Sequence, residues 1–284
     1  MHLNCYDTLV GNLDDIRLLA EAAESALAQE EKGSDRSHIK QGNAMTRAAL
    51  VLLCGYFEGF VREIAEEFFA ILKEEKVQLD VFPAPLFCAV AKEMVGKLDP
   101  QKANTIANFK EILSDNKDVP FNEKQLAKTG GNPTVDTIEG VFNYLGIPVI
   151  IDALSIRDYD IDTTFHKESQ VDQIMKNRIS DVIQKRFADA VPETIDEIVK
   201  LIDTKWPSKQ ARRKVGYVRD IEEILKKRNR IAHGEGSEQI TPLELSEFLD
   251  KITKLATGLH EMACISLKEI QAHSYNTPTD LTVN

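Results

Sequence analysis

Apolar residues recur at helical spacing in four long stretches, two toward each end of the chain. The first stretch runs from about residue 12 to 31, and the second from about 41 to 76 with an almost wholly apolar centre at 48–57. The third and fourth run from about 213 to 233 and from 242 to 270. Apolar residues three and four apart give a helix one face to bury. These stretches predict four helices that pack as one bundle.

The segment from 80 to 207 has shorter and weaker patterns. Prolines and the turn sequence Gly130-Gly131-Asn132-Pro133 separate stretches of helical spacing at 86–97, 103–113, 135–145, 171–188 and 192–205. The apolar run 147–151 fits either a short strand or the edge of a buried helix. We therefore expect an all-α fold: one elaborated domain over residues 1–284, with an α-helical insertion between the second and third bundle helices.

Composition limits the class of protein. The chain has 284 residues, 43% hydrophobic and 29% charged, as a globular domain does. Its 46 acidic against 35 basic residues give a formal net charge of −11, which argues against indiscriminate coating of nucleic acid. We expect a cytoplasmic protein without a membrane span, because no apolar stretch approaches about 20 residues and the first residues do not resemble a signal peptide. Its four cysteines and six histidines lack metal-site spacing, so no metal and no cofactor is expected.

Positive charge is concentrated in one segment. Residues 205–230 hold ten basic and three acidic residues, a local charge of +7 in a chain of −11. Such a strip suits local phosphate binding, and the alternative is an ordinary solvated helix face. The residues expected to contact RNA are Arg212, Arg213, Lys214, Lys226, Lys227 and Arg230.

One arginine occupies a core-facing position in the third bundle helix. On a helical wheel Arg228 lies on the stripe formed by Ile221, Ile224 and Leu225. A guanidinium cannot give up its charge, so it must meet a carboxylate, reach water or face a site that binds anions. Glu58, on the otherwise apolar second helix, is the candidate carboxylate. We expect Glu58 to pair with a core arginine or with the arginine four residues after it, and so to support the site.

Two further residues give this segment a chemical interpretation. Asn229 and His233 are four residues apart and share a helix face, whereas Arg228 and His233 lie about 140° apart on an ideal helix. The last two converge only across a symmetric dimer or where the helix frays. A histidine transfers protons near neutral pH, an arginine neutralises phosphate charge and an asparagine orients either, which together suffice for metal-independent RNA cleavage. Taken alone, His233 has the ordinary explanation of a helix-terminal histidine stabilised by the helix dipole.

The sequence of this segment resembles a known family. Arg228-Asn229-Arg230-Ile231-Ala232-His233-Gly234 resembles the RN-x3-H signature of the HEPN superfamily. Residues 49–63, Gly131-Asn132 and 145–147 are similar to recurring blocks of a large bacterial branch of it. The resemblance implies a four-helix core and a homodimer in which two motifs form one composite RNA-cleaving site. Arg228 is then expected to stabilise the scissile phosphate, His233 to activate the 2′-hydroxyl or protonate the leaving oxygen, and Asn229 to position both.

The resemblance also implies a biological setting. Members of the superfamily are often endoribonuclease toxins, so the resemblance implies a toxin–antitoxin or antiphage module, with an antitoxin or another defence-system protein as the expected partner besides RNA. Toxin relatives that are silenced by nucleotidyl transfer carry a tyrosine two residues after the histidine, where this chain has Glu235; that regulation is not expected here. The alternative function is a non-catalytic HEPN adaptor for dimerisation or for binding nucleotides or proteins.

Overall fold

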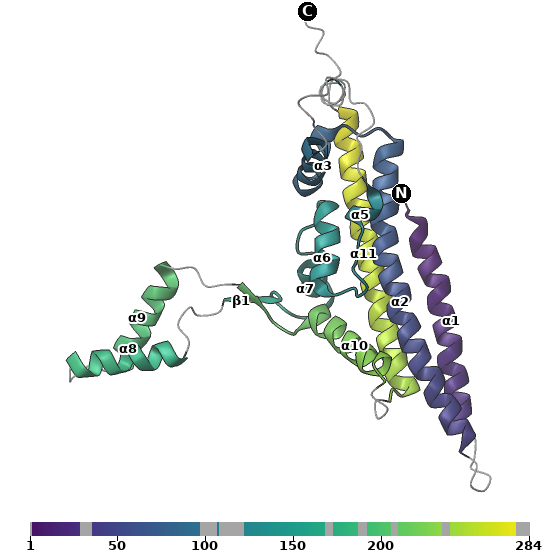
Figure 1. Cartoon of the computed structure of the whole chain (residues 1–284), viewed down its shortest axis with the longest axis horizontal. Helices are drawn as coiled ribbons and strands as arrows, with labels where there is room; N and C mark the ends of the chain where they lie inside the picture. Colours follow the sequence, from purple (N-terminus) through teal and green to yellow (C-terminus); the bar gives the residue numbers. More distant parts are fainter. Residues whose placement is uncertain are drawn as a thin grey trace, which may run out of the picture. The chain divides into compact units, whose positions relative to one another are not determined.

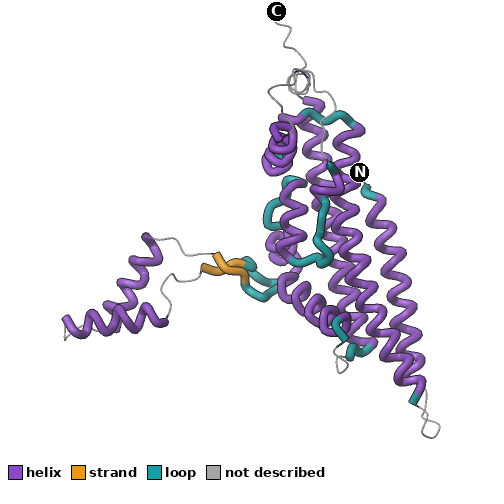
Figure 2. The backbone as a smooth tube through the Cα atoms, viewed as in Figure 1, coloured by secondary structure: helices purple, strands orange, loops and turns teal. Residues whose placement is uncertain are grey.

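The computed structural model describes residues 2–28, 36–96, 107, 122–167, 173–186, 192–205, 210–234 and 239–276. It divides into two compact units, one made of Met1–Leu154 with Tyr217–Asn284 and the other of Ser155–Gly216. Helix dominates the described residues, and strand is confined to one short pair (Figure 2). The predicted all-α fold is confirmed.

Three long helices form the centre of the larger unit. They are α1 (Asn4–Leu27), α2 (Ser37–Glu74) and α11 (Pro242–Asn276), each in contact with the other two, and they lie side by side in Figure 1. Helix α1 begins earlier than its apolar pattern predicted. The carboxylate of Glu67 on α2 accepts hydrogen bonds from the backbone N–H groups of Asn4 and Cys5 at 2.8 and 3.0 Å and so satisfies the first turn of α1.

Helix α2 is the most deeply packed of the three. It buries a row of large side chains, Leu50, Leu53, Phe57, Phe60, Ile64, Phe68 and Phe69. Within the described residues it is also the one helix whose length and apolar composition match those of a membrane span. Because α1 and α11 pack against it, its apolar surface is accounted for as the core of the bundle.

Shorter elements cover one side of these helices. They are η1 (Leu79–Val81), α3 (Ala84–Gly96), α5 (Glu123–Leu126), α6 (Val135–Tyr144) and α7 (Ile150–Asp158). Both α5 and α6 contact α2, and α3 contacts α6. The hydroxyl of Thr134 caps α6 by accepting from the N–H of Thr137 at 3.2 Å. The apolar run 147–151 is the edge of a helix and not a strand, because α7 starts at Ile150. The predicted helix at 103–113 lies outside the described residues, except for residue 107.

The smaller unit contains a strand pair and two helices. Strand β1 (Phe165–Lys167) pairs antiparallel with β2 (Gln210–Arg212), and between them in sequence lie α8 (Gln173–Arg186) and α9 (Pro192–Lys205). The helices were predicted and the strands were not, since three residues are too few to show an alternating pattern.

Helix α10 (Gly216–Ala232) is oriented by charged contacts with α11. Lys251 on α11 lies 3.4 Å from the buried carboxylate of Asp220 and 3.7 Å from that of Glu223, and Lys227 pairs with Glu244. Helix α11 is capped at its start, since the hydroxyl of Thr241 accepts from the N–H of Glu244 at 3.1 Å. These contacts fix which face of α10 meets the bundle.

Candidate functional site

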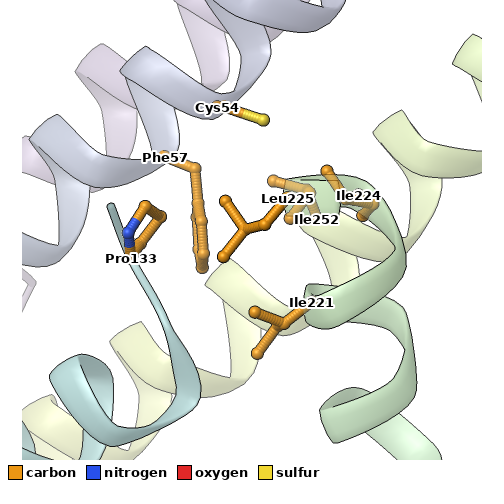
Figure 3. A pocket seen from close by; sticks show the side chains of 7 residues that line it. All are labelled: Cys54, Phe57, Pro133, Ile221, Ile224, Leu225 and Ile252. Carbon is orange, nitrogen blue, oxygen red and sulfur yellow. The ribbon is translucent and has the colours of Figure 1, made fainter. Parts of the chain in front are cut away.

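The apolar face of α10 borders a hollow beside α2. The hollow is small, about 10 Å³ or roughly the space of one water molecule, and is lined by Cys54, Phe57, Pro133, Ile221, Ile224, Leu225 and Ile252. Figure 3 shows the ring of Phe57 between Pro133 and the apolar side chains of α10. Arg228 is four residues after Ile224, so it continues this apolar stripe toward the end of the helix.

Arg228 is partly buried, as its place on the stripe predicted, and its hydrogen bonds go to neutral groups. Its Nη1 donates to Oδ1 of Asn132 at 3.3 Å and to Oδ1 of Asn229 at 3.0 Å. Its Nε is buried and donates to none of the described groups. No carboxylate in the described part of the chain lies within ion-pairing distance of it. The guanidinium therefore keeps an uncompensated positive charge next to the bundle core.

The pKa of the Cys54 thiol shows how strongly the groups around Arg228 are shielded from water. Burial raises its pKa to about 12, and the nearby positive charge of Arg228 offsets part of that effect. The side chain is 5% exposed and lines the apolar hollow. Desolvation thus dominates here, and any charge that remains, such as that of Arg228, acts in a weakly screened environment.

Glu58 does not form the ion pairs that were expected of it. Its Oε1 accepts a hydrogen bond from the hydroxyl of Thr129 at 2.8 Å. Arg62, four residues further along α2, instead lies 3.7 Å from Glu63 and 3.9 Å from Glu66. The physical reason is the loop between α5 and α6, which supplies Glu58 with a hydroxyl donor and supplies Arg228 with an amide acceptor.

The three motif residues are not all in contact with one another. Asn229 is partly buried and bonded to Arg228, whereas His233 is exposed just after the end of α10. The backbone N–H of His233 donates to the carbonyl of Asn229 at 2.9 Å, and Gly234 with φ of 74° ends the turn. The structure therefore brings Arg228 and Asn229 together and leaves the imidazole open to solvent.

Sequence reasoning did not assign Asn132 or Thr129 to this site. The sequence Gly130-Gly131-Asn132-Pro133 reads as a turn, and the conformation agrees, because both glycines have positive φ, 72° and 98°. A signal was nevertheless present. A core-facing arginine needs an acceptor, and an asparagine within a loop is suited to supply one.

The basic residues expected to contact RNA differ in their surroundings. On α10, Lys226 and Arg230 are exposed, and Lys227 is paired with Glu244. In the smaller unit the Arg212 guanidinium lies 4.5 Å from the centre of the Phe165 ring and Arg213 donates to the carbonyl of Thr163, while Lys214 is exposed. Contacts that support the fold thus engage Arg212, Arg213 and Lys227.

The described residues contain no group of three histidine, cysteine, aspartate or glutamate side chains arranged to hold a metal ion. The functional groups of the candidate site come from six described residues. They are the guanidinium of Arg228, the amides of Asn132 and Asn229, the hydroxyl of Thr129, the carboxylate of Glu58 and the exposed imidazole of His233.

Comparison with known proteins identifies the family. Neither curated proteins nor solved structures gave a match to this chain. The family model described as RiboL-PSP-HEPN matches residues 13–178 and 155–264, which together span most of the sequence and include Arg228, Asn229 and His233. The chain therefore belongs to the RiboL-PSP-HEPN family.

Proposed function

We propose that this protein is a metal-independent endoribonuclease whose active site is built from Arg228, Asn229 and His233 of two subunits in a homodimer. The observation that carries the proposal is the state of Arg228, which is partly buried, bonded only to amide oxygens and without a carboxylate partner among the described residues. Keeping a guanidinium in this condition costs free energy. A phosphate group supplies the missing negative charge.

The reaction that these groups support is transesterification within RNA. A histidine takes the proton of a ribose 2′-hydroxyl, and the oxygen attacks the adjacent phosphorus. The bond from phosphorus to the 5′-oxygen breaks, and a second histidine returns a proton to that oxygen. The products are a 2′,3′-cyclic phosphate and a 5′-hydroxyl end. Arg228 stabilises the added charge on the phosphate oxygens, which is the role that preorganised donors perform in such reactions.

A dimer is proposed because one subunit offers one motif histidine, and its position falls on a different face of an ideal helix from the arginine. Arg228 and His233 lie about 140° apart around an ideal helix. His233 is exposed and has no side-chain hydrogen bond to the described residues, so it is available to a second subunit. Two copies related by a two-fold axis bring a second histidine to the same phosphate.

Cleavage of RNA by purified variants tests the proposal. Arg228→Ala and His233→Ala are expected to lose at least about 100-fold in rate, as loss of a charge-stabilising or proton-transferring group does. His273→Ala is the matched control, since it removes an exposed imidazole from the far end of α11. If wild type, His233→Ala and the control all cleave RNA at the same rate, the activity comes from a contaminant and the proposed nuclease function is refuted.

Mixing subunits tests the composite site. Wild-type and His233→Ala protein are combined in equal amounts and allowed to exchange subunits. If both motifs of a dimer are required, only about one quarter of the dimers are active, whereas independent subunits retain about one half of the activity. Sedimentation of the same samples measures the dimer directly, and a monomer that cleaves at full rate contradicts the proposed arrangement.

The proposal includes a cytoplasmic toxin or antiphage role, with an antitoxin or defence protein as partner. Expression of wild type is then expected to stop growth, and expression of His233→Ala is not. A non-catalytic adaptor behaves differently, because the His233→Ala variant keeps its partner and no variant changes RNA.

A further inference from the structure

The loop between α5 and α6 is fastened to two different helices within four residues. At one end the hydroxyl of Thr129 donates to Glu58 of α2 at 2.8 Å. At the other end Oδ1 of Asn132 accepts from Nη1 of Arg228 on α10 at 3.3 Å. The next residue, Pro133, is buried and lines the hollow beside Phe57 (Figure 3). We call residues 129–133 the clamp loop.

The clamp loop has a defined backbone conformation that requires glycine at two positions. Gly130 and Gly131 have φ of 72° and 98°, values that side chains other than glycine seldom adopt. These two residues turn the chain between its anchors and are exposed, while Thr129 and Pro133 on either side are buried. The anchors thus hold the position of Asn132 relative to both α2 and α10.

The chemistry of the acceptor matters as much as its position. Both side chains that accept from Arg228, Asn132 and Asn229, are amides, and both accept from the same atom, Nη1. Nη2 donates to none of the described residues. An amide oxygen orients a guanidinium and leaves its charge intact, whereas a carboxylate in the same place satisfies the charge. The arrangement fixes the direction of Arg228 and preserves its attraction for an anion.

We propose that Asn132 is a positioning residue, which, through the clamp loop, holds the Arg228 guanidinium with its Nη2 edge and full charge directed at an RNA phosphate. The inference rests on the proposed function, because it assigns Arg228 to the phosphate. It adds a fourth side chain, about 100 positions away in sequence, to the three of the motif. It also gives Glu58 a role as the anchor of the loop through Thr129.

Two substitutions at Asn132 separate positioning from mere structural support. Asn132→Ala removes the acceptor, and Asn132→Asp replaces it with a carboxylate that holds Arg228 and neutralises it. We expect both variants to lose at least about ten-fold in kcat for RNA cleavage with little change in KM, since the charge acts mainly in the transition state. Asn132→Asp is expected to be as stable to heat as wild type or more so. Lys128→Ala, an exposed change just before the loop, is the matched control.

Full activity of Asn132→Asp would overturn the inference, because a purely structural acceptor is replaced well by a carboxylate. If Asn132→Ala fails to fold, Thr129→Val loosens the other anchor without changing the size of the side chain. A smaller loss of kcat is then expected, and an unchanged kcat again counts against positioning.

The position of Arg228 is also measured without any activity. Its Nε–H is buried, so its ¹⁵N-coupled proton signal, assigned with Arg228→Lys, is expected to exchange slowly with water in wild type and at least about ten-fold faster in Asn132→Ala. Unchanged exchange contradicts the positioning role even if the enzyme is active. Absence of RNA cleavage in wild type with the exchange effect present contradicts the proposed function and leaves the clamp established.

Discussion

Replacing Arg228 with methionine separates charge from packing at the site. The guanidinium donates two hydrogen bonds to partly buried amides and holds one buried Nε–H that lacks a partner among the described residues. Hydrogen bonds to charged groups contribute about 1.5–3 kcal/mol each, but both amide oxygens regain water when the arginine is gone, which offsets much of that loss. Removing the unpaired Nε–H returns about 1–3 kcal/mol, and methionine adds apolar contact to the stripe.

The net change in unfolding free energy is therefore expected to lie within about 1 kcal/mol of zero, a shift in Tm of no more than about 4 °C. Cleavage of RNA is expected to fall by about 100-fold to 1,000-fold, the effect of deleting a preorganised donor to a developing negative charge. Differential scanning calorimetry and a cleavage assay on the same sample measure both quantities. Lys128→Met, an exposed change outside α10, is the matched control and should retain cleavage.

The opposite pattern refutes this reasoning. Breaking a buried ion pair costs about 3–5 kcal/mol, so an Arg228 that serves the fold through a carboxylate gives a fall in Tm of at least about 6 °C. A strongly destabilised Arg228→Met that still cleaves RNA at the wild-type rate shows that the arginine is structural.

Three further predictions follow from the packing of the bundle. The Cys54 thiol, with its pKa raised to about 12 by burial, should resist alkylation at pH 8 in the native protein while the exposed Cys88 reacts, and equal rates contradict the burial. Burial and the neighbouring charge of His2 lower the pKa of His260, whose Nε2 accepts from the backbone N–H of Leu3 at 3.2 Å. As the pH falls, this histidine is therefore protonated in the unfolded chain before it is protonated in the folded chain. The free energy of unfolding keeps its full value above about pH 6.5 and decreases as the pH drops below it. An equally steep decrease in a His260→Gln variant would reject this cause. Thr241→Ala should cost about 1 kcal/mol by removing the cap of α11, measured by denaturant unfolding, and no change contradicts the capping role.

The four bundle helices were predicted well because each carries a long periodic pattern, whereas the four-residue helix α5 was not predicted. The same pattern placed Arg228 on the apolar stripe of α10, and its partial burial agrees. The periodic pattern does not predict which hydrogen-bond or ion-pair partner each side chain meets. Glu58 was expected to meet an arginine and meets Thr129 instead, because hydrogen bonds between distant segments depend on the path of a loop that has no period.

The position of the closest packing between α2 and another helix was also not predictable from the glycines of α2 alone. Gly55 and Gly59 are one turn apart on α2, a spacing typical of a face that another helix approaches closely. Among the described residues, however, a Cβ on Gly55 would meet nothing within 4 Å, and one on Gly59 would meet only the side chain of Glu63 at 3.9 Å. The close approach lies at Gly42, where a Cβ would come within 2.6 Å of Leu27 on α1. Which glycine permits contact is decided by the partner helix, and a single helix pattern does not contain that information.

Analysis of the RNA ends made by the purified protein in EDTA tests the central claim most directly. A short RNA labelled at its 5′ end is incubated with wild type and with His233→Ala, and the products are resolved before and after treatment that opens cyclic phosphates. The account predicts 2′,3′-cyclic phosphate ends from wild type in the presence of EDTA and none from His233→Ala. Intact RNA with wild type, cleavage that EDTA abolishes, or 3′-hydroxyl ends would contradict it.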